Sequence, residues 1–264
     1  MKKYLVIGNP IKHSLSPKLH NHWIKKNNID AVYDKKQLNE NDIEGTILKV
    51  RNGEIDGINV TIPFKKSVIP YLDQLTPLAN EAQSVNTIYK EKNKVIGHNT
   101  DVGGFELGLK RINYNVKNKK VFILGAGGVV SSIILALKKM GSSKIILSNR
   151  TKEKAEDLKK IYSDLEIIDW GETPDFNVII NATSLGLKNH DEIKLDYTDM
   201  GSNKLFYDVI YNPRQTKFLS KAKQLGNQIE NGKMMFVYQA HQAFTIWHKI
   251  MPEIDDETIK LLDQ

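Results

Sequence analysis

Short apolar runs alternate with longer amphipathic segments through the first hundred residues of the chain. The apolar run at residues 4–7 predicts a strand, and Ser16 followed by Pro17 predicts the N-cap and first turn of a helix that continues to residue 23. A further strand is expected over residues 55–62, where Pro63 ends it. The other elements predicted here are a broken helix over 73–82, a hairpin of 87–89 with 94–96, and a helix over 101–112.

The second half of the chain carries one strongly patterned unit, in which an apolar strand at 121–124 runs into glycines and a second strand follows at 144–148. Strands at 178–180 and 205–210 and a long apolar helix over 234–250 come after it. Strands that alternate with helices predict mainly parallel sheets covered on both faces. We therefore expect an α/β protein with two such sheets. Its predicted domains are residues 1–100 plus 235–264, and a doubly wound Rossmann-type domain over residues 101–234.

The glycine turn is typical of dinucleotide binding, because the N-terminus of the helix after such a turn can hold a pyrophosphate. The turn consists of Gly125, Ala126, Gly127, Gly128 and Val129. In proteins that bind NAD an acidic residue usually ends the second strand and bonds the ribose 2′-hydroxyl. The residues found there instead are Asn149, Arg150 and Thr151, with Lys154 beyond them. A cation at this place accommodates a 2′-phosphate, so the loop predicts NADP.

Composition narrows the possible functions. The 264 residues include no cysteine, which excludes disulfides and thiol chemistry. No apolar run approaches the length of a membrane span, and the N-terminus does not have the pattern of a signal peptide, so a cytoplasmic location fits. His20 and His22 stand two apart on a predicted helix and face different ways, and we expect no metal site. The net charge of +7 could indicate nucleic-acid binding, but scattered lysines without interleaved aromatic residues favour a solvated surface.

Polar residues gather inside the otherwise apolar first half. Ser14 and Ser16 stand at a predicted helix start, where an anion can bind, although Ser16 could simply cap the helix. Asn59 and Thr61 alternate with aliphatic residues and so share one face of their strand, which could also be a plain exposed face. Lys65 follows the proline break, where its amine can reach the end of that strand.

Three further polar residues stand near the ends or inside of predicted elements. Asn86 lies just before the hairpin, and Asp101 opens a helix, where it could be catalytic or only an N-cap or first-turn acid. Gln239 interrupts the apolar helix near the C-terminus, and a buried amide needs hydrogen-bond partners.

Taken together, these segments resemble the shikimate/quinate dehydrogenase family over nearly the whole chain. The resemblance rests on ordered motifs at residues 8–11, 13–17, 59–65, 85–87, 99–101, 125–128, 149–151, 181–186, 208–213, 232–234 and 239–240. It implies NADPH-dependent reduction of 3-dehydroshikimate to shikimate in the biosynthesis of chorismate and the aromatic amino acids. The glycine turn alone would be a weak signal, whereas this many motifs in order are highly specific.

The resemblance also implies site residues. Lys65 and Asp101 match the catalytic pair. The positions that match the substrate-binding residues are Ser14, Ser16, Asn59, Thr61, Asn86, Tyr211 and Gln239. The positions that match the NADP(H)-binding residues are Gly125, Ala126, Gly127, Gly128, Val129, Asn149, Arg150, Thr151, Lys154, Thr183, Ser184, Val209 and Gly232. A lysine is protonated near neutral pH, so Lys65 could supply the proton of the reduction, and an adjacent Asp101 would favour and orient its charged form.

Alternatives remain at this point. A quinate/shikimate dehydrogenase of broader substrate range fits the same motifs, although Arg150 argues against NAD. A non-catalytic NADP-binding sensor on the same fold would need neither Lys65 nor Asp101. We expect a small-molecule substrate, no nucleic-acid or membrane partner, and either a monomer or a homodimer.

Overall fold

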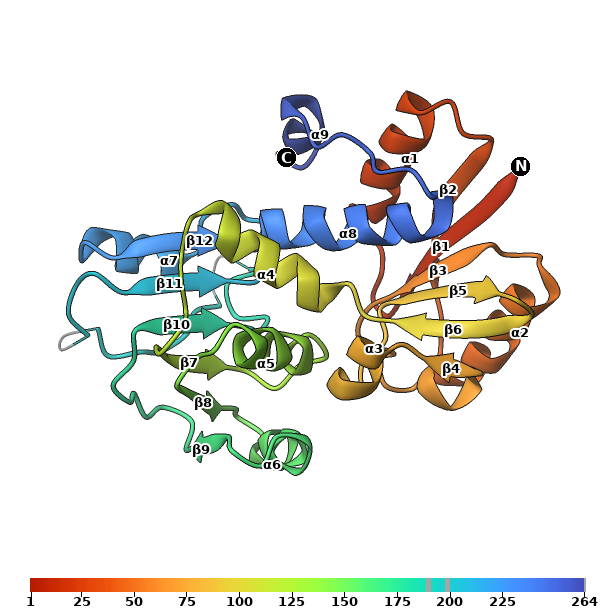
Figure 1. Cartoon of the computed structure of the whole chain (residues 1–264). Coiled ribbons are helices and arrows are strands. Elements are labelled where there is room, and N and C mark those ends of the chain that lie inside the picture. The colour runs from red at the N-terminus through yellow and green to blue at the C-terminus, as the bar shows by residue number, and fades with distance from the viewer. Residues whose placement is uncertain (189–190, 198–199, 264) are drawn as a thin grey trace. The chain divides into compact units, whose positions relative to one another are not determined.

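The computed structural model describes residues 1–188, 191–197 and 200–263, and these residues form two compact units. The N-terminal unit comprises Met1–Phe105 and Phe236–Gln264, and the Rossmann unit comprises Glu106–Met235. Each unit is built on a six-stranded sheet with helices, which confirms the predicted α/β fold (Figure 1). The chain passes between the units within helices α4 (Asp101–Arg111) and α8 (Lys233–His248).

The sheet of the N-terminal unit has the strand order β2-β1-β3-β5-β6-β4. Its strands are β1 (Lys2–Gly8), β2 (Ala31–Gln37), β3 (Gly57–Val60), β4 (Gln74–Leu75), β5 (Thr87–Glu91) and β6 (Lys94–His98). Strand β5 runs antiparallel to both of its neighbours, so this sheet is mixed, where a mainly parallel one was predicted. The reason lies in the hairpin, whose turn residues Lys92 and Asn93 both have positive φ, as a tight two-residue turn between antiparallel strands requires.

Helices cover both faces of this sheet. Their bounds are α1 (Ser16–Lys26), α2 (Ile43–Asn52), α3 (Pro77–Ala82) and α9 (Asp256–Lys260), with 3₁₀ turns η1 (Glu40–Asp42) and η2 (Ile69–Tyr71). On one face, the aliphatic side chains of α2 join those of β3 and β5 in one buried cluster. On the other, Trp23 of α1 meets Phe244 of α8 edge-on, with ring centroids 5.6 Å apart.

Several boundaries predicted from the sequence are wrong. Ser16 does not cap α1, because the N-cap is Leu15 and Ser16 is already helical; the helix continues to Lys26. Strand β3 is shorter than expected and ends at Val60. Part of the predicted broken helix is the short strand β4, which pairs with β6 before α3 begins.

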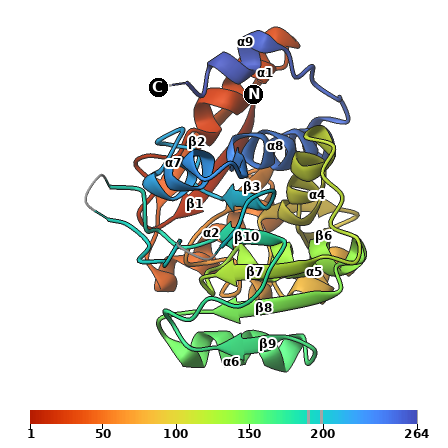
Figure 2. The same cartoon turned by 90° about the vertical axis from the view of Figure 1, so that its left-hand side faces the viewer.

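The Rossmann unit has an entirely parallel sheet of order β12-β11-β10-β7-β8-β9. Its elements are β7 (Lys120–Leu124), α5 (Val130–Lys139), β8 (Lys144–Ser148), α6 (Lys152–Ile161), β9 (Glu166–Ile168), β10 (Val178–Asn181), β11 (Leu205–Asp208), α7 (Lys217–Gln224) and β12 (Gln228–Asn231). Figure 2 shows β10, β7, β8 and β9 in succession across the sheet. The order reverses beside β7, and ligands of such sheets bind at the carboxyl ends of the strands next to such a reversal.

No helix in the described part of the chain combines the length and apolar character that crossing a membrane requires.

Candidate functional site

The Lys65 and Asp101 side chains form a buried ion pair in the N-terminal unit. The distance between Lys65 Nζ and Asp101 Oδ2 is 2.5 Å, and the two side chains are 9% and 7% exposed. Lys65 lies in the turn that follows β3, and its carbonyl accepts a hydrogen bond from the Val85 N–H at 2.8 Å, which fixes this turn against the segment before β5. An ammonium has three N–H donors, so after bonding Asp101 it retains protons for a second partner.

Asp101 is the first residue of α4, and its carboxylate bonds Lys65. Asn99 acts as a helix cap instead, because its Oδ1 accepts from the Val102 N–H at 3.2 Å, and its Nδ2 donates to the Ser84 carbonyl at 2.8 Å. Asp101 is therefore not the N-cap of α4 but an acid of its first turn, and its carboxylate bonds Lys65.

Asn59, the central residue of the predicted polar strand face, is 6% exposed and makes three side-chain hydrogen bonds. Its Nδ2 donates to the Asn86 carbonyl at 3.0 Å and to Thr87 Oγ1 at 3.1 Å. Its Oδ1 accepts from the Tyr33 hydroxyl at 2.6 Å. Both N–H donors of this amide are used within the protein, so what remains for a ligand is an acceptor position on Oδ1.

Asn86 lies next to Asn59 and is 2% exposed. Its Oδ1 accepts from the Thr100 N–H at 2.8 Å, and its Nδ2 donates to Thr100 Oγ1 at 2.8 Å and to Gln239 Oε1 at 3.4 Å. Gln239 also donates from Nε2 to the Phe236 carbonyl at 2.9 Å. The contact between Asn86 and Gln239 is the longest of these hydrogen bonds and the easiest for a ligand to replace.

The remaining predicted substrate residues carry hydroxyl groups. Ser16 is buried, and its N–H donates to Ser14 Oγ at 3.3 Å, while Ser14 and Thr61 are half-buried. Tyr211 belongs to the Rossmann unit, where it follows β11, and burial raises its pKa to about 12, which keeps the phenol protonated. Within the N-terminal unit the structure thus gathers an ion pair, amides and hydroxyls on the segments around β3 and β5.

The glycine turn after β7 has the features that close approach of a ligand requires. Gly125 has a φ of 105°, and a Cβ on it would lie 2.8 Å from the Ala182 carbonyl oxygen, so only glycine fits there. A Cβ on Gly127 would meet nothing nearer than that oxygen at 3.8 Å, so the protein itself leaves this position open. Gly128 and Val129 complete the turn, and α5 begins at Val130.

Asn149 supports this turn through its side chain. Its Oδ1 accepts from the Ala126 N–H at 3.0 Å, and its Nδ2 donates to the Thr151 carbonyl at 2.6 Å. Arg150, Thr151 and Lys154 are exposed, and neither cation forms an ion pair within residues 1–188, 191–197 and 200–263. Two cations free to meet a ligand therefore stand beside a turn whose shape Asn149 maintains.

The other predicted cofactor residues lie at the carboxyl ends of β10, β11 and β12. The Thr183 hydroxyl donates to Asn181 Oδ1 at 2.7 Å, and Ser184 is exposed. The Val209 N–H donates to the Asn181 carbonyl at 2.9 Å, and a Cβ on Gly232 would lie 2.6 Å from the Val209 carbonyl carbon. The backbone after β11 therefore lies too close to Gly232 for this residue to carry any side chain.

The site residues predicted from the sequence leave out Tyr33 and Asp208, two buried polar residues of these networks. Tyr33 bonds Asn59, as described above, but stands alone in a polar segment of edge strand β2. Asp208 accepts from Asn181 Nδ2, the Ile210 N–H and the Thr216 hydroxyl, at 3.0, 3.0 and 2.6 Å. Burial raises its pKa to about 6 in spite of these bonds. A cluster of potential metal ligands is not found among the described residues.

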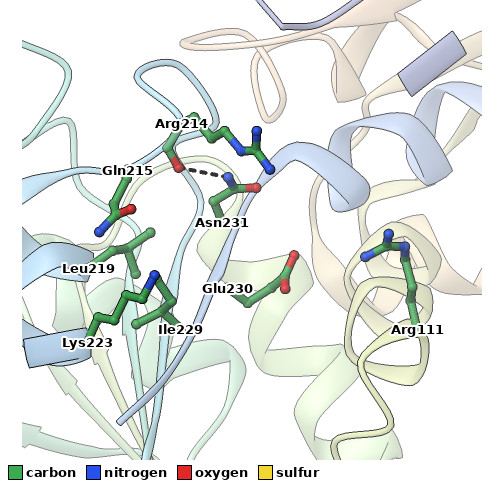
Figure 3. Close-up of a pocket in the computed structure, with 8 residues that line it drawn as sticks. All are labelled: Arg111, Arg214, Gln215, Leu219, Lys223, Ile229, Glu230 and Asn231. Carbon is green, nitrogen blue, oxygen red and sulfur yellow. Dashed lines mark hydrogen bonds between the residues drawn. The ribbon is translucent and has the colours of Figure 1, made fainter. Parts of the chain in front are cut away.

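A separate pocket of about 520 Å³ lies in the Rossmann unit beside β12 and α7 (Figure 3). Its cations are Arg111, Arg214 and Lys223, and Asn231 Nδ2 donates to the Arg214 carbonyl at 2.8 Å. All three cations are exposed, and none of the predicted site residues lines this pocket. It is therefore distinct from the clusters described above.

Comparison with known proteins identifies the two halves separately. Residues 6–88 match the family model described as the shikimate dehydrogenase substrate binding domain, and residues 106–217 match that of shikimate / quinate 5-dehydrogenase. A protein of Pelagibacter ubique (strain HTCC1062) named shikimate dehydrogenase (NADP(+)) is 61% identical over 262 residues, which cover 99% of each chain.

Solved structures agree with these matches. The crystal structure of shikimate dehydrogenase from Aquifex aeolicus superposes with a TM-score of 0.89 at 36% identity and covers 100% of this chain and 98% of that one. The structure of shikimate 5-dehydrogenase from Thermus thermophilus, in complex with NADP(H) and shikimate, gives a TM-score of 0.89 at 27% identity, with 100% and 99% coverage. With both halves matched in order and a relative this similar along its full length, the chain belongs to the shikimate dehydrogenase family.

Proposed function

We propose that this protein catalyses the reversible NADPH-dependent reduction of 3-dehydroshikimate to shikimate, a step in the biosynthesis of chorismate and the aromatic amino acids. The observation that carries the proposal is the buried Lys65–Asp101 pair, in the same unit as the buried amides of Asn59 and Asn86. Relatives support it, since the Pelagibacter ubique protein is named for this activity and the Thermus thermophilus structure holds both ligands. In this proposal residues 1–100 with 235–264 bind the substrate and residues 101–234 bind the cofactor.

The reduction needs a hydride and a proton. NADPH, when bound, supplies the hydride that turns the substrate carbonyl into an alkoxide. Lys65 donates a proton from its ammonium to that alkoxide oxygen, and Asp101 holds the ammonium in position through their hydrogen bond. In the oxidation of shikimate, Lys65 takes the hydroxyl proton instead.

The substrate is a carboxylated ring with several hydroxyl groups, and the polar residues suit it by their hydrogen-bonding capacity. Ser14, Ser16 and Tyr211 are neutral donors for the carboxylate. Thr61, Asn86 and Gln239 face the ring hydroxyls, and Asn59 accepts from one of them, because its own donors are already used.

The residues of the Rossmann unit fit NADP. The openness at Gly127 leaves room for a pyrophosphate beside the start of α5. Arg150, Thr151 and Lys154 hold the 2′-phosphate, while Asn149 keeps the turn in shape. The rest of the proposed cofactor set is Gly125, Ala126, Gly128, Val129, Thr183, Ser184, Val209 and Gly232.

The catalytic assignment is tested by Lys65→Met. We expect kcat for NADP⁺ reduction with shikimate to fall by about 10²–10⁴, the usual contribution of a positioned acid–base group. Because the substitution leaves a buried charge on Asp101, the double variant Lys65→Met/Asp101→Asn separates lost chemistry from lost folding. Lys66→Met is the matched control, since Lys66 is the exposed neighbour. Near-normal turnover in a folded Lys65→Met protein would show that Lys65 is not the catalytic acid–base group.

The cofactor assignment is tested by Arg150→Asp. The preference in kcat/KM for NADP⁺ over NAD⁺ should fall by about ten- to hundredfold, the worth of charged hydrogen bonds. Lys159→Asp makes the same charge change further along α6 and should leave the preference unaltered. An unchanged ratio in Arg150→Asp would refute the role of this residue. The same assay with quinate in place of shikimate reports the breadth of substrate use.

A further inference from the structure

Asp208 is a buried carboxylate at the carboxyl end of β11, and three donors from different segments converge on it. Its Oδ1 accepts from Asn181 Nδ2 and from the Ile210 N–H, both at 3.0 Å. Its Oδ2 accepts from the hydroxyl of Thr216, the N-cap of α7, at 2.6 Å. The two oxygens therefore serve different parts of the Rossmann unit, because Oδ1 holds groups at the strand ends and Oδ2 holds the start of α7.

The Asn181 amide connects Asp208 with the turn of residues 181–185, which follows β10. Its Nδ2 donates to the Leu185 carbonyl at 3.1 Å as well as to Asp208. Its Oδ1 accepts from the Thr183 N–H at 3.0 Å and from the Thr183 hydroxyl at 2.7 Å. The bonds to Thr183 and Leu185 lie within the turn itself. The bond to Asp208 is thus the side-chain contact that ties this amide to the neighbouring strand.

The turn of residues 181–185 packs directly on the glycine turn. A Cβ on Gly125 would lie 2.8 Å from the Ala182 carbonyl oxygen and 3.0 Å from Thr183 Cγ2. Because the two turns are in contact, a shift of Thr183 must change either the glycine turn or the space beside it. The position of the 181–185 turn therefore affects the proposed pyrophosphate site.

The Ile210 N–H is the second group that Asp208 Oδ1 holds. The Ile210 carbonyl in turn accepts from the Gly232 N–H at 3.2 Å, and Val209 stands between Asp208 and Ile210 in the chain. Strands β10, β11 and β12 lie side by side in the sheet (Figure 1). The proposed cofactor residues at their ends, Thr183, Val209 and Gly232, are thus all linked through the backbone or a neighbouring residue to this one oxygen.

We propose that Asp208 is a positioning residue for the dinucleotide, whose Oδ1 anchors the Asn181 amide and the Ile210 N–H and so keeps the ends of β10, β11 and β12 in the shape that binds NADP. The inference rests on the proposed function, because that function supplies the cofactor. Oδ2 holds the start of α7 and takes no part in this role. The proposal therefore predicts different results for the loss of each oxygen.

Three variants separate the two oxygens, and calorimetry without shikimate gives the Kd of each for NADP⁺. Asp208→Ala removes both oxygens, and the Kd should rise about tenfold, the worth of one buried hydrogen bond at the upper end of its range. Asp208→Asn should stay within about threefold of the wild type, because Thr216 is the one partner that can accept from the new NH₂ group, which leaves Oδ1 in place. Thr216→Val removes the bond to Oδ2 alone and should stay within about twofold.

A role in stability alone predicts another pattern. The folded Asp208→Ala and Thr216→Val proteins would then bind NADP⁺ with the same Kd, although both have lost hydrogen bonds. That result would overturn the proposal. So would an Asp208→Asn protein that binds NADP⁺ as weakly as Asp208→Ala does.

A fourth variant serves if Asp208→Ala does not fold. Asn181→Ala removes the amide and leaves Asp208 its bonds to Ile210 and Thr216. The Kd for NADP⁺ should again rise about tenfold, because the 181–185 turn has lost its anchor. A folded Asn181→Ala protein with the Kd of the wild type would contradict the positioning role.

The anchoring can also be measured without any cofactor. In hydrogen exchange of the free protein, the Thr183 N–H, which bonds Asn181 Oδ1, should exchange about tenfold faster in Asp208→Ala than in Thr216→Val. Equal exchange rates in these two variants would show that Asp208 does not hold the turn.

The proposed function and the positioning role fail differently. A wild-type protein that does not bind NADP⁺ overturns the cofactor assignment, and the role of Asp208 with it. A wild-type protein that binds NADP⁺, while folded Asp208→Ala binds it equally well, overturns the positioning role alone.

Discussion

His20 should make the N-terminal unit less stable in acid. The side chain is fully buried and packs on the rings of Trp23, Tyr33, Phe244 and Trp247, with no hydrogen-bond partner for either nitrogen among the described residues. Burial lowers its pKa to about 3, and the neighbouring charge of His248 acts in the same direction. Protonating His20 in the folded state would place an uncompensated cation among aromatic rings.

The sign and the size of the effect follow from linkage between protonation and folding. In the unfolded chain His20 has an ordinary pKa near 6.5, so between about pH 6.5 and 3 the unfolded state binds a proton that the folded state does not. Stability therefore falls as the pH is lowered through this window, by at most about 1.4 kcal/mol per pH unit. Lowering the pH from 7 to 5 should cost about 2 kcal/mol through this one group.

The variant His20→Phe removes the titration and keeps an aromatic ring in the stack. Overpacking can cost about 1–3 kcal/mol, but at both pH values alike. The quantity to compare is the loss of unfolding free energy between pH 7 and pH 5, which should shrink by about 2 kcal/mol in the variant. Urea unfolding followed by tryptophan fluorescence suits the measurement, because Trp23 and Trp247 both touch His20.

A control substitution separates this effect from the general acid sensitivity of the protein. His13 is exposed, so His13→Phe should leave the difference between pH 7 and pH 5 as it is in the wild type. If His20→Phe and the wild type lose equal stability on acidification, the buried neutral histidine is not the cause, and the reasoning from burial is wrong.

Two further substitutions test the packing of the Rossmann unit and its strand ends. Gly232→Ala places a Cβ against the Val209 carbonyl and should lower the free energy of unfolding by about 1–3 kcal/mol, measured by urea unfolding. The control is Gly45→Ala, in helix α2, where the new Cβ meets nothing within 4 Å and should stabilise the protein slightly. Equal losses of stability in the two variants would contradict the steric argument. Thr216→Val removes the donor to Asp208 Oδ2 and should cost about 1.5–3 kcal/mol at pH 7. The cost should be smaller at pH 5, where Asp208, with its pKa of about 6, is largely protonated, and a pH-independent loss would count against a charged hydrogen bond.

The sequence predicts best where one short segment contains the whole signal. The alternation around Asn59 and the glycine turn at Gly125 are local patterns, and the structure places each at the end of a strand. Tyr33 could not be found this way, because its hydrogen bond to Asn59 depends on β1 lying between their two strands. Nothing in the polar segment around Tyr33 indicates which strands lie beside it in the sheet.

The same limit explains the interpretation of Ser16 as a helix cap. A serine before a proline is a good N-cap by composition, but the backbone is already helical at Leu15, and Ser14 accepts the Ser16 N–H. Asn149 shows the converse: its place in the motif was predicted, whereas its hydrogen bond to the Ala126 N–H becomes visible only in three dimensions.

The Lys65–Asp101 pair is hard to explain as a device for stability. Removing two charges from water costs several kcal/mol, and replacing such a pair by apolar residues is often neutral or stabilising. The amides of Asn59 and Asn86 are neutral, and their N–H donors are all used in hydrogen bonds within the protein. Lys65, by contrast, keeps unused donors at a buried position. Under the proposed function, this cost is offset by a proton donor for the alkoxide, which the reduction of a carbonyl requires.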